Sequence, residues 1–285
     1  MPELPEVETI ARSLRPLILR RTVGRVELLF RPLLRAESAD DLDAVRGREV
    51  RGIRRRGKML VLEFEGGHAL VFHLKMTGQF LWVSKDEPRD KHTRLVLYFP
   101  GEDRELRFRD VRKFGFLLCH KATGIDSCQE VATLGPEPLE IGFPEFTERI
   151  AGRRGRIKSL LLNQTFIAGI GNIYADEILF EGKIHPRSEA QALSRNDVRR
   201  IWEAMRAILS KAIAAKGTTL QDYTDAEGRV GEFQLEHKVY GREGEKCEGC
   251  GATIRRIVLG GRSTFFCPRC QKRRRRWKKG RAGKD

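Results

Sequence analysis

Residues 247–270 read CEGCGATIRRIVLGGRSTFFCPRC, and this stretch decides the fold of the segment around it. Its four cysteines form two C-x-x-C pairs with sixteen residues between the pairs. Each pair can place two thiolates on one tetrahedral metal ion, so two pairs complete a closed zinc site. We expect one structural Zn²⁺ ion with four ligands, namely Cys247, Cys250, Cys267 and Cys270. Redox or disulfide chemistry is the alternative use of such pairs.

The residues between the two cysteine pairs predict a β-hairpin. The runs 253–259 and 263–266 are rich in β-branched and aromatic residues, and Gly260-Gly261 between them suits a tight turn. Arg262 would lie at the hairpin tip. A closed site leaves no open coordination position, so we expect the metal to stabilise structure rather than to catalyse. The other two cysteines, Cys119 and Cys128, lack partners at metal spacing, and we interpret them as ordinary core or surface residues.

Basic residues predominate over the whole chain. Lys and Arg number 55 against 39 Asp and Glu, a net charge of +16. The segment 272–285 holds nine of these basic residues and one acid, so a net charge of +8 remains without it. A polyanion is the natural partner of such a body. The alternative is a solvated basic surface with a disordered basic tail at 272–285.

Length and hydropathy set the class of protein. The chain has 285 residues, 40% of them hydrophobic, which is enough for two domains with buried cores. No run approaches the roughly 20 apolar residues that span a bilayer, and the first residues lack the pattern of a signal peptide. We therefore expect a cytoplasmic protein with no membrane partner. No dimer signature is present, so a monomer is the default expectation.

The first half of the chain predicts one helix followed by many strands. Leu4, Val7, Ile10 and Leu14 recur at helical spacing, and Pro16 should end or kink this helix near residue 15. Short alternating or apolar runs then follow between turn signals, which is typical of a β-sandwich or barrel. The expected strands are 23–30, 49–54, 59–64, 69–74, 95–99, 105–108 and 115–118.

The second half is predicted to be helical after a connector at 134–144. The expected helices are 144–151, 156–162, 173–181 and 195–215, with a short piece near 219–223. Gly169 and Gly171 precede the third of these, with Asn172 at its N-cap position. The glycines suit either a tight helix–turn–helix joint or a phosphate site at a helix N-terminus. Four basic residues lie upstream and suggest a helical pair that grips a nucleic-acid backbone: Arg153, Arg154, Arg156 and Lys158.

Several stretches, in order along the chain, closely resemble the bacterial formamidopyrimidine-DNA glycosylase family. They are MPELPEVETI (1–10), Lys58 after Arg-Arg-Gly, HLKMTG (73–78), RDVRKFG (109–115), NQTFIAGIGNIYADEILF (163–180), VYGREGEKC (239–247) and GRSTFFCPRCQ (261–271). The resemblance implies an α+β multidomain fold. Its parts would be an N-terminal helix plus β-sandwich catalytic domain at 1–135, a helix–two-turns–helix DNA-binding domain with a lesion loop at 136–235, a β-hairpin zinc finger at 236–271 and the basic tail at 272–285.

The resemblance implies base-excision repair of damaged double-stranded DNA. Oxidised purines, such as 8-oxoguanine and formamidopyrimidines, would be excised, and the strand would then be cleaved at the abasic site by β,δ-elimination. Removal of Met1 would leave a secondary amine on Pro2, and an α-amine has an ordinary pKa near 8, against about 10.4 for lysine. By resemblance, Pro2 is the nucleophile that forms the Schiff base and Glu3 its acid–base partner. Without the resemblance, Pro2 would be an ordinary residue at the chain start, and Glu3 would be an acidic residue that interacts favourably with the helix dipole.

Further site residues are also implied by the resemblance. Lys58 and Arg262 would contact phosphate and donate protons during elimination; otherwise they would be a solvated strand-edge lysine and a solvated turn arginine. Phe114 would wedge into the duplex, an established way to unstack a step, while Met76 and Arg112 fill the space of the flipped base. His92, Arg154 and Asn172 match positions that contact phosphate. The segments 218–223 and 225–231 resemble a loop that closes over the flipped base.

Two other functions remain open on sequence grounds. An endonuclease VIII-like enzyme would share Pro2, Glu3 and the finger but excise oxidised pyrimidines; the set Met76, Arg112 and Phe114 favours the purine enzyme. A non-catalytic zinc-finger DNA-binding protein would fit the charge and the cysteines equally well. Pro2, Glu3 and Lys58 together favour an enzyme.

Overall fold

The computed structural model describes residues 1–35, 42–121, 128–218, 226, 229 and 231–274. The chain forms two compact units: Met1–Glu137 with Ser210–Glu236 is the first unit, and Pro138–Leu209 with His237–Asp285 is the second unit. The units do not follow chain order, because 210–236 groups with the N-terminal residues. The four-part division predicted from the sequence remains a prediction.

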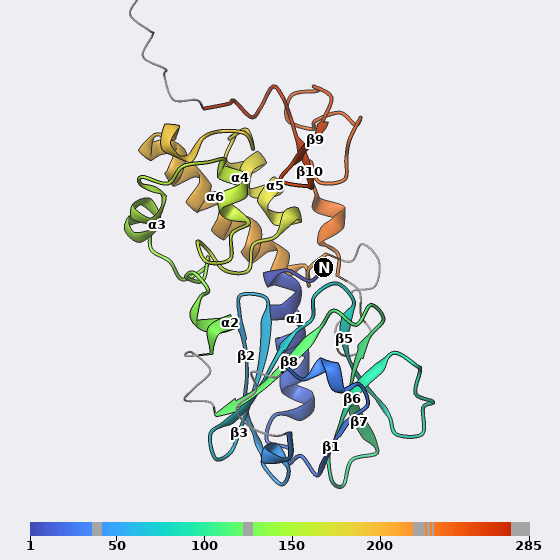
Figure 1. Ribbon diagram of the computed structural model, residues 1–285. Coiled ribbons are helices and arrows are strands. Elements are labelled where there is room, and N and C mark those ends of the chain that lie inside the picture. Colours follow the sequence, from blue (N-terminus) through green and yellow to red (C-terminus); the bar gives the residue numbers. More distant parts are fainter. Residues whose placement is uncertain (36–41, 122–127, 219–225, 227–228, 230, 275–285) are drawn as a thin grey trace, which may run out of the picture. The chain divides into compact units, whose positions relative to one another are not determined.

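Two four-stranded antiparallel sheets make up most of the first unit (Figure 1). One has the order β1-β6-β7-β5 and the other the order β2-β3-β4-β8. The strands are β1 (Arg25–Leu28), β2 (Val50–Arg56), β3 (Met59–Phe64), β4 (His68–His73), β5 (Gly78–Ser84), β6 (Thr93–Tyr98), β7 (Arg104–Asp110) and β8 (Phe116–Lys121). The predicted β-sandwich is confirmed.

The core of the first unit lies between the two sheets and includes helix α1 (Leu4–Ile18). Phe72 of one sheet contacts Phe80 and Phe108 of the other, with ring centroids 4.9 and 5.4 Å apart. The central strands β3 and β4 are buried on both faces because their second face packs on the short helix α2 (Gln129–Ala132) through Val131. Cys119 and Cys128 are both buried in this unit.

Helix α1 is longer than predicted. Pro16 lies inside it and the helix continues to Ile18, so the prediction that it ends or kinks near residue 15 is wrong about its end. A proline in the last turn removes only one helical hydrogen bond. Ile18 is fully buried in the core, and this packing favours the extra turn.

The second unit holds helices α3 (Phe143–Ile150), α4 (Ile157–Leu161) and α5 (Asn172–Glu181) and all but the last turn or so of α6 (Arg195–Ala214). A two-stranded antiparallel hairpin, β9 (Arg255–Leu259) and β10 (Arg262–Phe266), follows them (Figure 1). Short 3₁₀ segments occupy Arg31–Leu33, Leu42–Val45, Ala190–Ala192 and Phe233–Glu236. The predicted fold class is therefore confirmed. In the described ranges, no helix is both long and apolar enough to cross a bilayer.

Two sequence predictions need correction here. Strand β5 was not predicted, although Phe80 and Trp82 alternate with less buried neighbours along it. Gly78 at its start forms a Thr-Gly turn signal with Thr77, and this signal hid the period of two. Asn172 is the first residue of α5 rather than its cap, because Gly171 has the extended backbone of the N-cap and no side chain caps the helix.

Candidate active site and nucleic-acid interface

The first turn of α1 holds the chain start in place. Glu3 is the N-cap residue, and its backbone N–H donates to the Glu6 carboxylate at 2.8 Å, the reciprocal arm of a capping box. Pro2, Glu3 and Glu6 are all buried, whereas Met1 is about half exposed. The predicted nucleophile position and its acid–base partner therefore stand on a fixed helix end rather than on a loose terminus.

Glu6 also ties this helix end to a distant segment. Its other carboxylate oxygen accepts the N–H of Thr218 at 2.8 Å. Gly217 has φ +81°, and a Cβ there would lie 2.8 Å from that same oxygen, so only glycine fits. Thr218 is thus fixed against the helix that carries Glu3. Most of the predicted lesion loop, 219–225 with 227, 228 and 230, lies outside the described residues.

Lys58 lies in the two-residue turn between β2 and β3 and is only 8% exposed. Gly57 takes φ +57°, which glycine adopts at no steric cost. The Glu137 carboxylate accepts the Gly57 N–H at 2.6 Å and pairs with Arg55 at 2.6 Å. Arg55 also pairs with Glu8 of α1 at 3.3 Å, so one chain of charges links the Lys58 turn to the helix of Pro2 and Glu3.

His73 belongs to this region, although no role was predicted for it from the sequence. Its Nδ1 accepts the N–H of Lys75 at 3.0 Å, so the neutral ring carries its proton on Nε2. Burial, together with the charges of Lys75 and Lys58, lowers the pKa of His73 to about 3. A neutral imidazole thus stands close to Lys58. His73 begins the stretch HLKMTG, of which only Met76 was predicted as a site residue.

The structure brings Met76, Arg112 and Phe114 together on the surface of the first unit. The Arg112 guanidinium lies 4.8 Å from the centroid of the Phe114 ring and donates from Nη1 to Met76 Sδ at 3.0 Å. Met76 is 44% exposed and Phe114 51% exposed. Large exposed apolar side chains at one spot are typical of an interaction site.

A buried carboxylate fixes the loop that carries two of these residues. Asp110 accepts the Thr77 hydroxyl at 2.5 Å and the Gly115 N–H at 2.8 Å, and the Arg112 N–H donates to that same hydroxyl at 3.1 Å. The Asp110 N–H donates to the carbonyl of His92 at 2.9 Å, which places His92 beside the root of this loop. The loop is therefore rigid at both ends while its tip is exposed.

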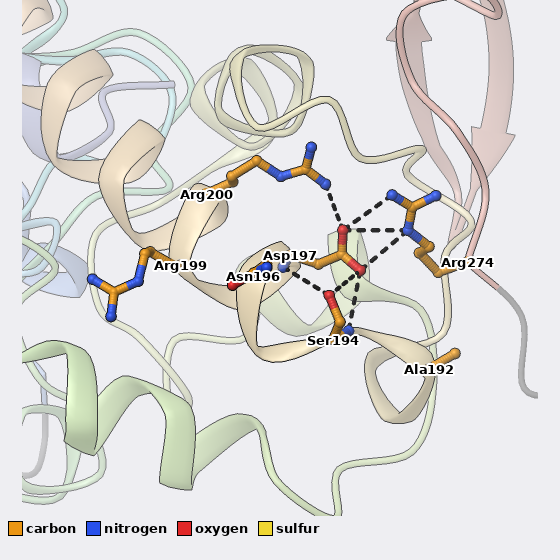
Figure 2. A pocket seen from close by; sticks show the side chains of 7 residues that line it. All are labelled: Ala192, Ser194, Asn196, Asp197, Arg199, Arg200 and Arg274. Carbon is orange, nitrogen blue, oxygen red and sulfur yellow. Dashed lines mark hydrogen bonds and ion pairs between the residues drawn. The ribbon is translucent and has the colours of Figure 1, made fainter.

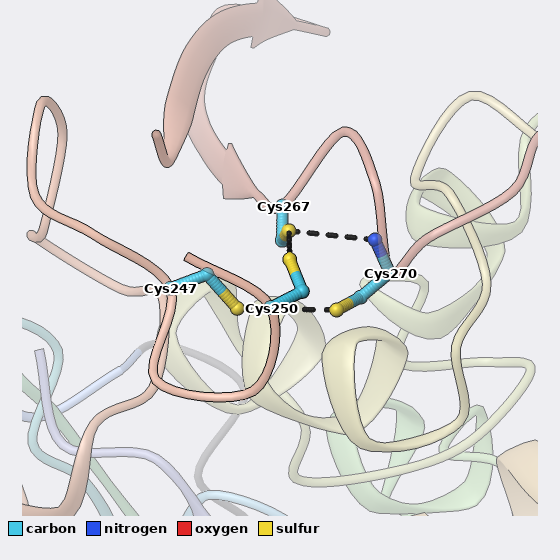
Figure 3. Close-up of side chains that lie close together, drawn as sticks. All are labelled: Cys247, Cys250, Cys267 and Cys270. Carbon is cyan, nitrogen blue, oxygen red and sulfur yellow. Dashed lines mark hydrogen bonds between the residues drawn. The ribbon is translucent and has the colours of Figure 1, made fainter. Parts of the chain in front are cut away.

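The four predicted metal ligands converge in the second unit, as Figure 3 shows. Their sulfur atoms all lie within 4.8 Å of one another, with Cys250 to Cys267 at 3.4 Å and Cys247 to Cys270 at 3.9 Å. Thiolates bound to one tetrahedral zinc at about 2.3 Å stand about 3.8 Å apart. The donor set fits one structural zinc ion, and the zinc prediction is confirmed.

Arg262 is exposed as the first residue of β10, directly after the Gly260-Gly261 turn. A buried ion pair holds the strand behind it. Lys158 Nζ lies 2.7 Å from Asp176 Oδ1 and donates to Thr264 Oγ1 at 2.8 Å and to the Ser263 carbonyl at 3.2 Å. Asp176 accepts the Phe265 N–H at 2.9 Å. Burial raises the pKa of Asp176, and the Lys158 ammonium opposes that shift.

This finding corrects the interpretation of Lys158 as part of a basic nucleic-acid grip, because its side chain is buried and turned onto β10. Asn172 joins the same network through its Nδ2, which donates to the Ser263 carbonyl at 3.0 Å. Arg154 is exposed in the segment before α4. The structure thus groups Pro2, Glu3, Lys58, His92 and the Met76 cluster in one unit, and Arg154, Asn172, Arg262 and the cysteines in the other.

Comparison with known proteins covers nearly the whole chain. Residues 1–117 match the formamidopyrimidine-DNA glycosylase N-terminal domain, 134–224 match the H2TH domain of the same proteins, and 244–273 match the zinc finger found in FPG and IleRS. Formamidopyrimidine-DNA glycosylase of Solibacter usitatus is 46% identical over 275 residues, which are 96% of this chain and all of that protein. The Desulfitobacterium hafniense protein of the same name is 44% identical over 95% of this chain and all of its own.

Solved structures agree. The Lactococcus lactis Fpg in complex with an abasic site containing DNA has a TM-score of 0.86 and 35% identity, covering 95% of this chain and 100% of that one. The MutM (Fpg) protein of Thermus thermophilus has a TM-score of 0.85 and 41% identity, covering 95% and 98%. Sequence, fold and cysteine site agree, and the chain belongs to the formamidopyrimidine-DNA glycosylase family of base-excision-repair enzymes.

Proposed function

We propose that this protein excises oxidised purines, 8-oxoguanine and formamidopyrimidines, from double-stranded DNA and cleaves the resulting abasic site. The observation that carries this proposal is the fixed start of α1. There the Glu3 N–H is held by Glu6, and Glu8 connects through Arg55 to the turn of Lys58. An amine nucleophile, an acid–base carboxylate and a cationic side chain are thus carried by elements of one unit.

In the first step the Pro2 amine, exposed after removal of Met1, attacks C1′ of the flipped nucleotide. The bond between C1′ and the base breaks, and the base leaves with a proton. Glu3 donates a proton to the sugar ring oxygen, so that the ring opens and a cationic iminium joins Pro2 to C1′. The damaged nucleotide must leave the base stack before this can happen.

Elimination follows from the positive charge of the iminium. It withdraws electrons from C2′, the C2′ proton is lost, and the 3′ phosphate leaves; a second elimination expels the 5′ phosphate. We assign phosphate contact and proton donation to Lys58 in the first elimination and to Arg262 in the second. The support is the fixed backbone of both turns, in which Gly57 and Gly260-Gly261 have positive φ.

We propose that Met76 and Arg112 fill the space that the flipped base leaves in the duplex and that Phe114 wedges into the base stack. Their mutual contacts and exposure support this assignment. Guanidinium N–H groups are also the donors that the acceptors of an orphaned cytosine need. His92, Arg154 and Asn172 are proposed phosphate contacts, and each is at least partly exposed. We further propose that the enzyme acts as a monomer on the nucleoid in the cytoplasm, where its substrate lies.

A second substrate class is favoured by one relative. Wild-type Lactococcus lactis Fpg, 36% identical over 95% of this chain, was solved with an oxidized pyrimidine containing DNA. Matched duplexes with 8-oxoguanine or thymine glycol, each opposite its normal partner, would rank the two classes. We expect faster excision of 8-oxoguanine opposite cytosine, and a clear preference for thymine glycol would assign the protein to the endonuclease VIII side.

Borohydride trapping tests the proposed chemistry. The protein is incubated with a duplex that carries 8-oxoguanine opposite cytosine, sodium borohydride is added, and the adduct is mapped by peptide mass. We expect a covalent adduct on Pro2 and intact protein that lacks Met1. If no adduct forms on this duplex or on an abasic one, or if Met1 is retained, the non-catalytic DNA-binding alternative takes its place.

Glu3→Gln is the matched variant. It keeps the Pro2 amine but removes the acid, so base excision should fall by about 10²- to 10⁴-fold. The adduct with a duplex that already carries an abasic site should still form. Equal loss of both activities would mean that Glu3 holds the terminus rather than transferring protons.

A further inference from the structure

In the second unit, two arginines share one carboxylate where α6 begins. Arg200 and Arg274 pair with Asp197 at 2.5 and 3.1 Å, and Figure 2 shows their guanidinium groups turned toward it. The Ser194 hydroxyl donates to the same carboxylate at 2.9 Å. An ion pair of this kind neutralises its cations and fixes the start of the helix, so this group is complete in itself. A second group of cations, in the first unit, is held by a different kind of partner.

Arg94 and Lys113 both lie over the aromatic ring of Phe30. The Arg94 Cζ is 5.1 Å and the Lys113 Nζ 5.3 Å from the centroid of that ring. The negative face of an aromatic ring attracts a cation within about 6 Å but does not neutralise it. Phe30 follows β1 and is partly buried against the core between the two sheets. Packing therefore fixes the ring that holds both cations.

Arg94 connects this ring to the start of the loop between β7 and β8. It is buried on β6, and its Nε donates to the carbonyl of Asp110, the last residue of β7, at 2.9 Å. The Arg94 carbonyl in turn accepts the N–H groups of Leu29 and Phe30 at 2.9 and 3.2 Å. One residue therefore fixes both the backbone that carries the ring and the strand end from which the loop departs.

Lys113 lies at the exposed tip of that loop, between Arg112 and Phe114. Its φ is +60°, which is uncommon for a residue with a Cβ atom. Such a conformation costs free energy and persists where the surrounding structure imposes it. Arg112 contacts both Phe114 and Met76, whereas Lys113 contacts Phe30. The side chains of the tip therefore form two groups, one that the proposed function places in the duplex and one that the protein itself holds.

We call Phe30, Arg94 and Lys113 the loop brace. We infer that the loop brace holds the tip in place while Phe114 unstacks the duplex, so that Phe30 and Lys113 are positioning residues for extrusion of the damaged base. Unstacking a base step costs free energy, and the wedge transfers the resulting force to the loop. The hydrogen bonds of Asp110 fix the two ends of the loop, and the brace adds a contact at its tip. The inference rests on the proposed function for the role of Phe114.

Unstacking of duplex DNA by the full chain tests this inference. The fluorescent base 2-aminopurine is placed beside 8-oxoguanine in a duplex with cytosine opposite the lesion, and its fluorescence rises when the neighbouring bases separate. Phe30→Leu and Lys113→Gln should each slow this rise by about three- to tenfold, because each removes a contact between a cation and a ring. Phe30→Tyr and Lys113→Arg keep a ring and a cation, so they should restore the rate to within about twofold.

Three comparisons separate positioning from a loss of stability. The effects of Phe30→Leu and Lys113→Gln should not add in the double variant, because both changes break the same contact. Phe30→Leu should have no further effect in a chain that carries Phe114→Ala, because the wedge is then gone. Cleavage of a duplex that already carries an abasic site should slow by less than about twofold, since there is no base to extrude.

Arg25→Gln is the matched control. Arg25 also lies over a ring of the first unit, with Cζ 4.0 Å from the centroid of Tyr98. The substitution removes the same charge and the same kind of contact at the start of β1, outside the loop, so the duplex should unstack at the normal rate. The thermal transition of the first unit, followed for every variant, reports its folding.

Three results would overturn the loop brace. They are normal unstacking in both Phe30→Leu and Lys113→Gln, slow unstacking in only one of the two, which would mean that Lys113 contacts DNA itself or that Phe30 acts only in packing, and equal slowing of abasic cleavage, which would mean a general loss of folding. If the unaltered protein did not unstack the duplex, the wedge and the brace would fail together. Normal unstacking without an adduct on Pro2 would refute the proposed chemistry and leave the brace intact, so the two failures are distinguishable.

Discussion

The turn of Lys58 and the turn before Arg262 present a basic residue in similar ways but are stabilised differently. Both are tight hairpin turns with glycine at positive φ. Lys58 is 8% exposed, and its turn is held by Glu137 and Arg55 within a large sandwich. Arg262 is exposed on a two-stranded hairpin, which is marginal by itself. The small finger therefore needs a metal site in addition to a buried ion pair, whereas side-chain contacts without a metal hold the turn in the sandwich.

Loss of the metal should produce the largest difference in stability between the regions of the two turns. Structural zinc contributes about 10 to 16 kcal/mol to finger peptides, so Cys250→Ser should unfold the finger while the sandwich keeps its own thermal transition. We expect zinc content near zero and loss of specific binding to lesion DNA, measured by metal analysis and titration. Cys128→Ser, a buried cysteine far from metal spacing, is the control. One retained zinc per chain in Cys250→Ser would contradict the four-ligand site.

Breaking the ion pair behind Arg262 should have the next largest effect. Lys158→Met leaves Asp176 buried without its partner and should cost about 3 to 5 kcal/mol in the second unit. The product of the second elimination should fall relative to that of the first, as measured on denaturing gels. Lys158→Met combined with Asp176→Leu should recover most of the stability but not the product ratio. If the ratio stays normal in both variants, the pair does not position Arg262.

On the Lys58 side, Glu137→Gln is the corresponding change. The substitution removes the charge from the ion pairs of Glu137 with Arg55 and Arg56, and it leaves a neutral amide to accept the Gly57 N–H. We expect the free energy of unfolding of the first unit to fall by about 2 to 3 kcal/mol. The first elimination on an abasic duplex should slow, while zinc content stays at one. Glu140→Gln, at an exposed carboxylate close by in the sequence, should change neither. Slowing of only the second elimination would reverse the assignment of the two turns.

Acidification should weaken both regions by smaller amounts. Burial is the main cause that lowers the pKa of His73 to about 3 and that of His237, in the second unit, to about 4. The unfolded chain therefore binds these protons first. The contribution of the two neutral histidines to the free energy of unfolding is fully present above about pH 6.5. It is lost as the pH falls toward the folded-state pKa of each histidine, and about 2 kcal/mol per histidine is lost at pH 5.

Urea unfolding at pH 7 and pH 5 measures this loss. His237→Gln should reduce the acid sensitivity of the second unit only, and His73→Gln that of the first unit only. An acid sensitivity that neither substitution changes would mean that carboxylates, not these imidazoles, set the response.

The sequence alone determined the local features. The cysteine spacing predicted the metal site, the Gly260-Gly261 pair predicted the finger turn, and hydrophobic periodicity located α1, α5 and α6 within a few residues. These depend on neighbours in sequence or on short repeats, so a single stretch contains the whole signal. The order of the quoted stretches was sufficient for the family, because each stretch is long and specific.

Only the tertiary structure decided how the functional residues are held. Lys158 contacts Thr264 from 106 residues away and Arg55 contacts Glu137 from 82 residues away, so no local pattern predicts either pair. Lys158 was misassigned to the surface because a basic residue in a basic stretch gives no sign of a buried partner. His73 was missed for the same reason, since its neutrality comes chiefly from burial, and of the two lysines that favour it Lys58 is brought near only by folding. Burial and charge pairing are properties of the assembled core, and the sequence specifies them only through the fold.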